Sequence, residues 1–164
     1  MGFCTFEKRK KLAIDVYQTL YEKWKLPIFA NMARSEQTHM EAVKLLINKY
    51  GLKDPVESKG VGEFTNPKFQ DLYNKLVEEG SKSIESALKI GAVIEEVDII
   101  DLQKHLTETN KKDIKLVYGN LIRVRKTISW RLHQIWQSME LPIDNISVKR
   151  NMKKYQQKKA LKRV

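Results

Sequence analysis

The sequence predicts an all-α protein, and two observations support this fold class. Apolar residues recur every three or four positions over long stretches, as they do along the buried face of an amphipathic helix. No stretch of useful length alternates apolar and polar residues as a half-buried strand does, and no internal repeat is present. At 164 residues with 41% apolar residues, the chain has the size of one domain with at most a tail.

The first two predicted helices occupy residues 8–24 and 28–50. In the first, apolar side chains fall at four-residue intervals, namely at Leu12, Val16, Leu20 and Trp24. Pro27 then separates it from the second helix, which Gly51 is expected to end as a C-terminal cap. Residues 52–66 contain one proline and two glycines, so they are expected to form a loop.

Three further helices follow. Asn66 before Pro67 is a helix-start signal for a short amphipathic helix that stops at Gly80. The next helix is expected over residues 84–106, after a serine cap, and the last one begins near Lys111.

Charge is distributed unevenly along the chain. The net charge is +11, but residues 124–164 contain 11 Lys+Arg and 2 Asp+Glu, net +9, so residues 1–123 are nearly neutral. We therefore divide the chain into a helical bundle over residues 1–123, its last helix continuing to about 136, and a basic, partly disordered tail over 124–164. With a single cysteine and no signal-like or membrane-spanning stretch, a soluble cytoplasmic protein is expected.

Two pairs of polar residues interrupt apolar helix faces. Glu36 and His39 are three residues apart, so they lie one turn apart on one face, among apolar neighbours. Shared binding of a divalent metal would satisfy their polar atoms if they are buried, and a solvated or hydrogen-bonded pair is the alternative. Glu95 and Asp98 repeat the spacing on a later helix, where the alternative is a solvated acidic side that includes Glu96.

Five segments together resemble an uncharacterised prokaryotic domain family of the ferritin-like, rubrerythrin-related superfamily. They are KLAIDVY at 11–17, FANMARSEQTH at 29–39, FTNP at 64–67, GAVIEEVDIIDL at 91–102 and VYGNL at 117–121. The resemblance implies an antiparallel four-helix bundle with a short extra helix between its second and third helices. It also implies a diiron or dimanganese centre, although it brings no established reaction with it.

Matched residue by residue, the resemblance places metal ligands at Glu36, His39, Glu95 and Asp98. The other two helices depart from the family pattern. Lys10 stands where the first helix should offer an acid, and a cation there would repel a metal. After Arg123 the family's Gly-Ser-x-x-His-Leu-x-Ala-Phe is missing, so the metal site is expected to be incomplete. Tyr17 or Tyr118 would donate hydrogen bonds to the ligands.

A slipped reading frame would explain both the break after Arg123 and the basic tail. Deleting one G from a run of Gs in a gene that encodes the family pattern yields the residues found after Arg123. Under this hypothesis residues 124–164 are an out-of-frame translation.

Three functions remain open from the sequence. The first is a non-haem iron or manganese carboxylate protein whose activity, enzymatic or not, is undetermined. The second is a basic protein whose tail contacts nucleic acid nonspecifically through phosphate neutralisation. The third is a scaffold without catalysis. Bundles of this kind often form homodimers, but no stripe of the sequence identifies such an interface.

Overall fold

A computed structural model describes residues 2–52 and 60–138, and these form five α-helices and no strand. Within this part of the chain, the predicted all-α class is confirmed. The helices are α1 (Gly2–Trp24), α2 (Pro27–Lys49), α3 (Pro67–Gly80), α4 (Ile84–Glu108) and α5 (Lys112–Ser138). The largest difference from the predicted bounds is at the first helix, which begins six residues before Lys8, where the apolar periodicity starts.

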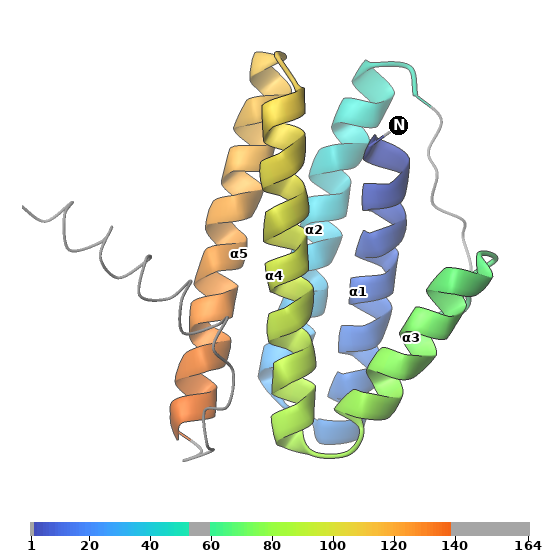
Figure 1. Ribbon diagram of the computed structural model, residues 1–164, viewed down its shortest axis with the longest axis vertical. Helices are drawn as coiled ribbons and strands as arrows, with labels where there is room; N and C mark the ends of the chain where they lie inside the picture. The colour runs from blue at the N-terminus through green and yellow to red at the C-terminus, as the bar shows by residue number, and fades with distance from the viewer. Residues whose placement is uncertain (1, 53–59, 139–164) are drawn as a thin grey trace, which may run out of the picture.

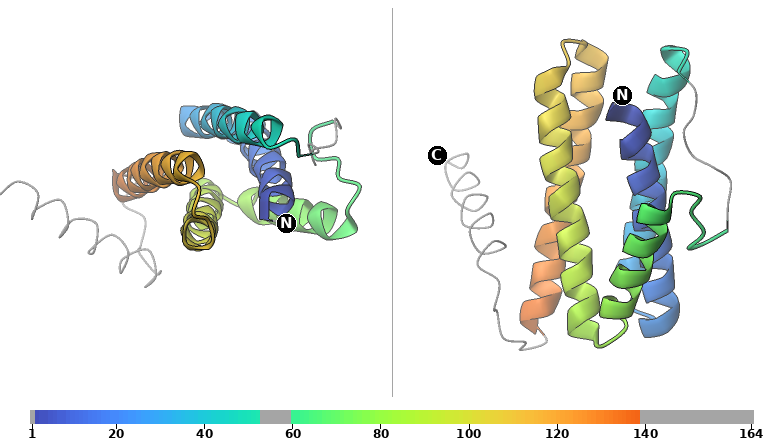
Figure 2. Two further views of the ribbon diagram at one scale, coloured as in Figure 1. Left: turned by 90° about the horizontal axis from the view of Figure 1, so that it is seen from above. Right: turned by 45° about the vertical axis from the view of Figure 1, so that its right-hand side comes forward.

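Four long helices lie lengthwise beside one another, and the shorter α3 crosses the outside of α1 and α4 (Figures 1 and 2). In Figure 1, α1 and α5 run downward and α2 and α4 run upward. The chain therefore makes two hairpins, α1 with α2 and α4 with α5, and α3 lies on the path between them.

Local sequence signals account for the helix ends. Pro27 occupies the start of α2, and Gly51 follows its end at φ +63°, a conformation that favours glycine. The amides of Gly51 and Leu52 donate to the carbonyls of Asn48 and Ile47, a Schellman ending. The side chain of Asn66 accepts from the amide of Lys68 at the start of α3, as predicted from the Asn-Pro pair.

The end of α3 packs closely against α1. A Cβ atom at Gly80 would lie 2.8 Å from Cδ2 of Leu20, so a larger residue there would require the Leu20 side chain to shift. The carbonyl of Gly80 also accepts a hydrogen bond of 2.9 Å from the indole of Trp24. These contacts fix the position of the α3–α4 turn along the axis of α1.

Two apolar clusters fill the space among the helices. The Leu20 cluster lies toward the α3–α4 turn and has these buried members: Leu12, Ala13, Val16, Tyr17, Leu20, Phe29, Met32, Ala33, Ala87, Leu88, Ile90, Ala92 and Leu132. The Leu102 cluster lies toward the α4–α5 turn and comprises Val43, Leu46, Ile47, Leu102, Ile114, Tyr118, Leu121 and Ile122. Along α2 and α4, the predicted polar positions Glu36, His39, Glu95 and Asp98 fall between the two clusters.

Helix α5 passes through Arg123 without interruption and ends at Ser138, and it buries Leu132 and Trp136. From the sequence, the last helix is expected to end at about residue 136. The division of the chain at Arg123 stays a prediction, and the rest of the proposed tail, 139–164, lies outside the described residues. None of the described helices has the length and apolar character needed to span a bilayer.

Candidate functional site

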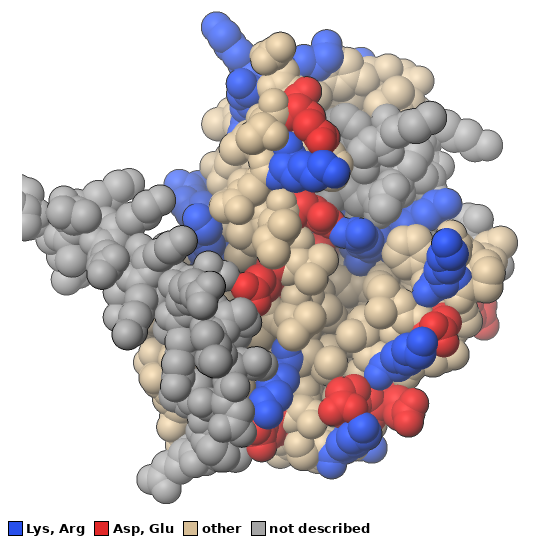
Figure 3. Space-filling model, viewed as in Figure 1, with Lys and Arg blue, Asp and Glu red and all other residues tan. Residues whose placement is uncertain are grey.

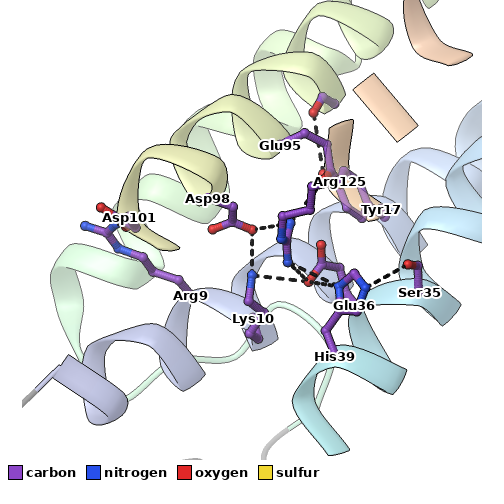
Figure 4. Close-up of polar contacts among 11 residues, drawn as sticks. Arg9, Lys10, Tyr17, Ser35, Glu36, His39, Glu95, Asp98, Asp101 and Arg125 are labelled. Atoms are coloured by element: carbon purple, nitrogen blue, oxygen red, sulfur yellow. Dashed lines mark hydrogen bonds and ion pairs between the residues drawn. The ribbon is translucent and has the colours of Figure 1, made fainter. Parts of the chain in front are cut away.

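The structure brings the four predicted site residues together between the apolar clusters (Figure 4). Glu36 and Glu95 have no exposed surface, and His39 and Asp98 are 5% and 3% exposed. The two pairs are thus not on solvated faces of α2 and α4. Because carboxylates are strongly hydrated in water, their burial requires charged or hydrogen-bonding partners inside the protein.

Arg125 of α5 is the main partner of these carboxylates, and it is fully buried. Its Nη1 lies 3.1 Å from Oε2 of Glu95 and 2.7 Å from Oδ2 of Asp98. Its Nη2 lies 2.7 Å from Oε2 of Glu36. One guanidinium therefore joins α5 to acids on both α2 and α4, using the planar set of donors that distinguishes arginine from lysine.

Lys10 of α1 is the second buried cation. Its Nζ lies 2.7 Å from Oδ2 of Asp98 and 3.3 Å from Oε2 of Glu36. These are the same two oxygens that Arg125 contacts. Each of the two oxygens is thus shared between two cationic nitrogens, one from α1 and one from α5.

Tyr17 and Ser35 add further hydrogen bonds to the centre. The Tyr17 hydroxyl donates to Oε1 of Glu95 at 3.1 Å, as expected for one of the two candidate tyrosines. Arg125 Nη2 lies 3.3 Å from Nδ1 of His39 and can only donate, so we assign the ring proton to Nε2. That nitrogen lies 3.3 Å from the Ser35 hydroxyl, which then accepts.

The pKa values of the two buried glutamates are shifted in opposite directions. Burial acts to raise the pKa of Glu36, but Lys10 and Arg125 outweigh it and hold this pKa well below its ordinary value. Burial raises the pKa of Glu95 to about 8, because only Arg125 opposes it strongly while Glu36 and Asp98 add to the increase. The difference follows from contact with two cations for Glu36 and with one for Glu95.

This arrangement does not fit a divalent metal. Metals such as zinc bind carboxylate oxygens at about 2.0–2.2 Å, and the two central oxygens already contact two cations each. A metal placed between them would stand beside an ammonium and a guanidinium, which would repel it. Across residues 8–52 and 60–138, whose side chains the structure describes, no group of three His, Cys, Asp or Glu side chains is placed to hold a metal.

The second candidate tyrosine and a buried histidine of α5 lie outside the centre. Tyr118, the second candidate tyrosine, is buried in the Leu102 cluster with its ring 6.3 Å from that of His105. His133 is buried further along α5, where burial lowers its pKa, and it makes no contact with the centre.

Arg125 is the residue of the centre that sequence reasoning missed. It was counted with the basic tail, although it lies seven residues after Tyr118 and seven before Leu132, both on the buried face. That spacing, two helical turns from each, was the available signal. A cation in line with apolar residues on a helix face requires buried acids opposite it.

The fold and the centre define an all-helical protein whose buried carboxylates are neutralised by its own lysine and arginine. The chain belongs to the family described as uncharacterized protein domain (DUF2202), whose model matches residues 2–135. The predicted membership of an uncharacterised domain family is thus confirmed, and the matched span extends past Arg123.

The chain is also similar to the uncharacterized protein MJ0754 of Methanocaldococcus jannaschii. The two are 56% identical over 122 residues, which cover 74% of this chain and 66% of the relative, just under two thirds of its length. A crystal structure of the hypothetical protein MJ0754 superposes with a TM-score of 0.81 at 48% identity, covering 87% of this chain and 81% of that one.

Proposed function

We propose that this chain is a ferritin-like antiparallel four-helix bundle, with α3 as the short extra helix, that works without a resident metal and without catalysis. Support for the architecture comes from the two hairpins of long helices and from the acids carried on α2 and α4. In this proposal the centre joins the helices, and the outer faces of the bundle supply its function as a scaffold or binding protein.

One observation carries the proposal: Glu36 Oε2 and Asp98 Oδ2 each contact both Lys10 and Arg125. Because these cations are side chains of the protein itself, the two acids always have positively charged partners, and the centre needs no ion from solution. The iron or manganese protein that the family resemblance implies would need both oxygens as ligands.

Metal analysis of the purified, full-length protein tests this function. After incubation with Fe(II) or Mn(II) and desalting, we expect far less than one metal per chain, and we expect EDTA to leave the unfolding temperature unchanged. A metal retained in stoichiometric amount, with a higher unfolding temperature, would contradict the proposal and favour the dimetal alternative.

A second candidate function is nonspecific binding of nucleic acid on the outer face of α5. Exposed lysines on α3, on α4 and in the turn between them form ion pairs with acids three or four residues away, as Lys75, Lys104 and Lys82 do. Positive and negative side chains accordingly alternate over that face (Figure 3). Helix α5 differs, because residues 114–138 include five Lys or Arg and no acid.

Four of those five cations lie on the surface of α5, at Lys115, Arg123, Lys126 and Arg131, and none of them makes an ion pair with a described residue. Trp130 is 40% exposed and lies on the side of Arg123 and Lys126, because it follows them by seven and four residues. Cations without internal partners can neutralise phosphates, and an exposed indole can stack on a base.

Salt-dependent binding of duplex DNA tests this candidate. A variant with Arg123→Glu, Lys126→Glu and Arg131→Glu should bind more weakly and with a shallower dependence on salt. Lys75→Glu, Lys82→Glu and Lys104→Glu give a control with the same change in net charge. If only deletion of residues 139–164 weakens binding, α5 is not the contact surface.

We also propose that the reading frame slipped after Arg123. Determining the nucleotide sequence across the Arg123 codon tests this proposal. The unslipped reading would put a serine in place of Arg125, and so would leave the acids of the centre with Lys10 as their cation. The ion pairs of Arg125 with three carboxylates weigh against an accidental origin for this residue. A continuous frame in the gene would end the hypothesis.

A further inference from the structure

The centre contains more negative charge than any other buried part of the described chain. Three carboxylates converge there from α2 and α4, and two cations face them from α1 and α5. Below the pKa of Glu95, about 8, this acid is protonated and the two cations balance Glu36 and Asp98. With all three acids ionised, the centre has a net charge of −1 even in the presence of both cations. Without the cations it would have −3, in a place where water cannot compensate.

The groups left behind by those cations would form a metal-ligand set. Three carboxylates and one imidazole are oxygen and nitrogen donors of the kind that bind Zn(II), Co(II), Mn(II) and Fe(II). Oε1 of Glu36 is buried and has no hydrogen-bond partner in the described structure, so it is an available acceptor.

His39 is already oriented as a metal-binding histidine would be. Its Nε2 faces the Ser35 hydroxyl, which holds the ring and leaves Nδ1 directed at the centre. A ligating histidine commonly has its other ring nitrogen fixed by such a hydrogen bond. Two groups lie near Nδ1, namely Nη2 of Arg125 at 3.3 Å and Oε2 of Glu36 at 3.6 Å, and only the first of them is a cation.

We propose that Lys10 and Arg125 close a latent divalent-metal site, and that replacing both with uncharged side chains opens it to a divalent transition-metal ion. The proposal rests on the proposed metal-free function, since it explains the absence of a metal by these two residues. The ligands in the opened site are Glu36, His39, Glu95 and Asp98.

The experiment uses the full chain with Lys10→Met and Arg125→Met, which keep apolar bulk and remove both charges. Cobalt(II) is the probe, because its visible absorption reports bound nitrogen and oxygen ligands. We expect the wild type to show no such bands and the double variant to bind about one Co(II) or more per chain. Its unfolding temperature should be low in EDTA and should rise as the Co(II) concentration rises.

A matched control adds Glu36→Gln, Glu95→Gln and Asp98→Asn to the same two substitutions. This variant keeps the shape of the centre and has no charge there, so it should fold without metal and show no Co(II) bands. A third variant, Lys10→Glu with Arg125→Met, adds a fourth carboxylate beside Asp98 and Glu36 and should bind Co(II) more tightly than the double methionine variant.

The outcomes separate this inference from the proposed function. A double variant that is unfolded in EDTA and folds on addition of Co(II) supports the inference. Three results for the double variant would overturn the inference. They are no binding of Co(II), binding no better than that of the uncharged control, and failure to fold with Co(II) present. Stoichiometric metal in the wild type would instead overturn the proposed function.

Discussion

The charged centre and the Leu102 cluster are neighbouring layers of the same four-helix body, and they are stabilised by different physical terms. The Leu102 cluster removes apolar side chains from water, so its contribution depends on volume and close packing. The centre removes charges from water, which is costly unless every charge finds its partner. A defect in the first layer leaves a cavity, whereas a defect in the second leaves a buried unpaired charge.

The largest expected effect is at the centre. Arg125→Met leaves three buried carboxylates with Lys10 as their cation, so we expect a loss of about 4 kcal/mol in the free energy of unfolding. Urea denaturation measures it. Arg123→Met is the matched control, because this exposed arginine lies two residues away on the same helix, and no measurable change is expected. Equal stability of the two variants would contradict the role assigned to the ion pairs.

The apolar layer should respond to lost volume. Leu102 has no exposed surface, and Leu102→Ala is expected to cost about 3 kcal/mol through lost transfer energy and the cavity left behind. Leu102→Met, which nearly conserves volume, should recover most of that loss. A large loss in both variants would mean that this layer tolerates shape changes as poorly as the centre tolerates charge changes.

The dependence of stability on pH should come from the centre. The pKa of Glu95 is about 8 in the folded protein against an ordinary value of 4.5, so the folded state binds the extra proton between these values. Stability should therefore fall as pH rises from about 5 to 8, by at most about 1.4 kcal/mol per pH unit from this group.

Glu95→Gln keeps the neutral form at every pH and should remove that part of the slope. Denaturation curves at several pH values would show it. Glu96→Gln, on the outer side of the same helix, is the control and should leave the slope in place. A slope that persists in Glu95→Gln would assign the titration to another group.

The smallest effect is expected at the surface of α3. Lys75 and Asp71 form an ion pair of 2.7 Å with both side chains more than 60% exposed, and water already solvates each charge. Lys75→Met should leave the denaturation midpoint unchanged within error, in contrast to Lys10→Met, whose ammonium is buried. A measurable loss at Lys75 would mean that exposed pairs stabilise this protein more than such pairs generally do.

The sequence alone determined the helices, their faces and much of the centre. Apolar periodicity, Pro27, Gly51 and the Asn66 cap are local signals, and each acts through residues within a turn or two of itself. The inward direction of Glu36, His39, Glu95 and Asp98 was predicted from their place in line with apolar neighbours, and burial in the structure excludes the solvated alternative.

Only the tertiary structure decided what those residues meet. Periodicity gives the face of each helix but not the height at which two faces meet, so it leaves open which side chains share a layer. Lys10 and Asp98 are 88 positions apart, and Arg125 and Glu36 are 89 apart. Their pairing depends on how the hairpins pack, and that packing puts two cations where the sequence pattern predicted a metal.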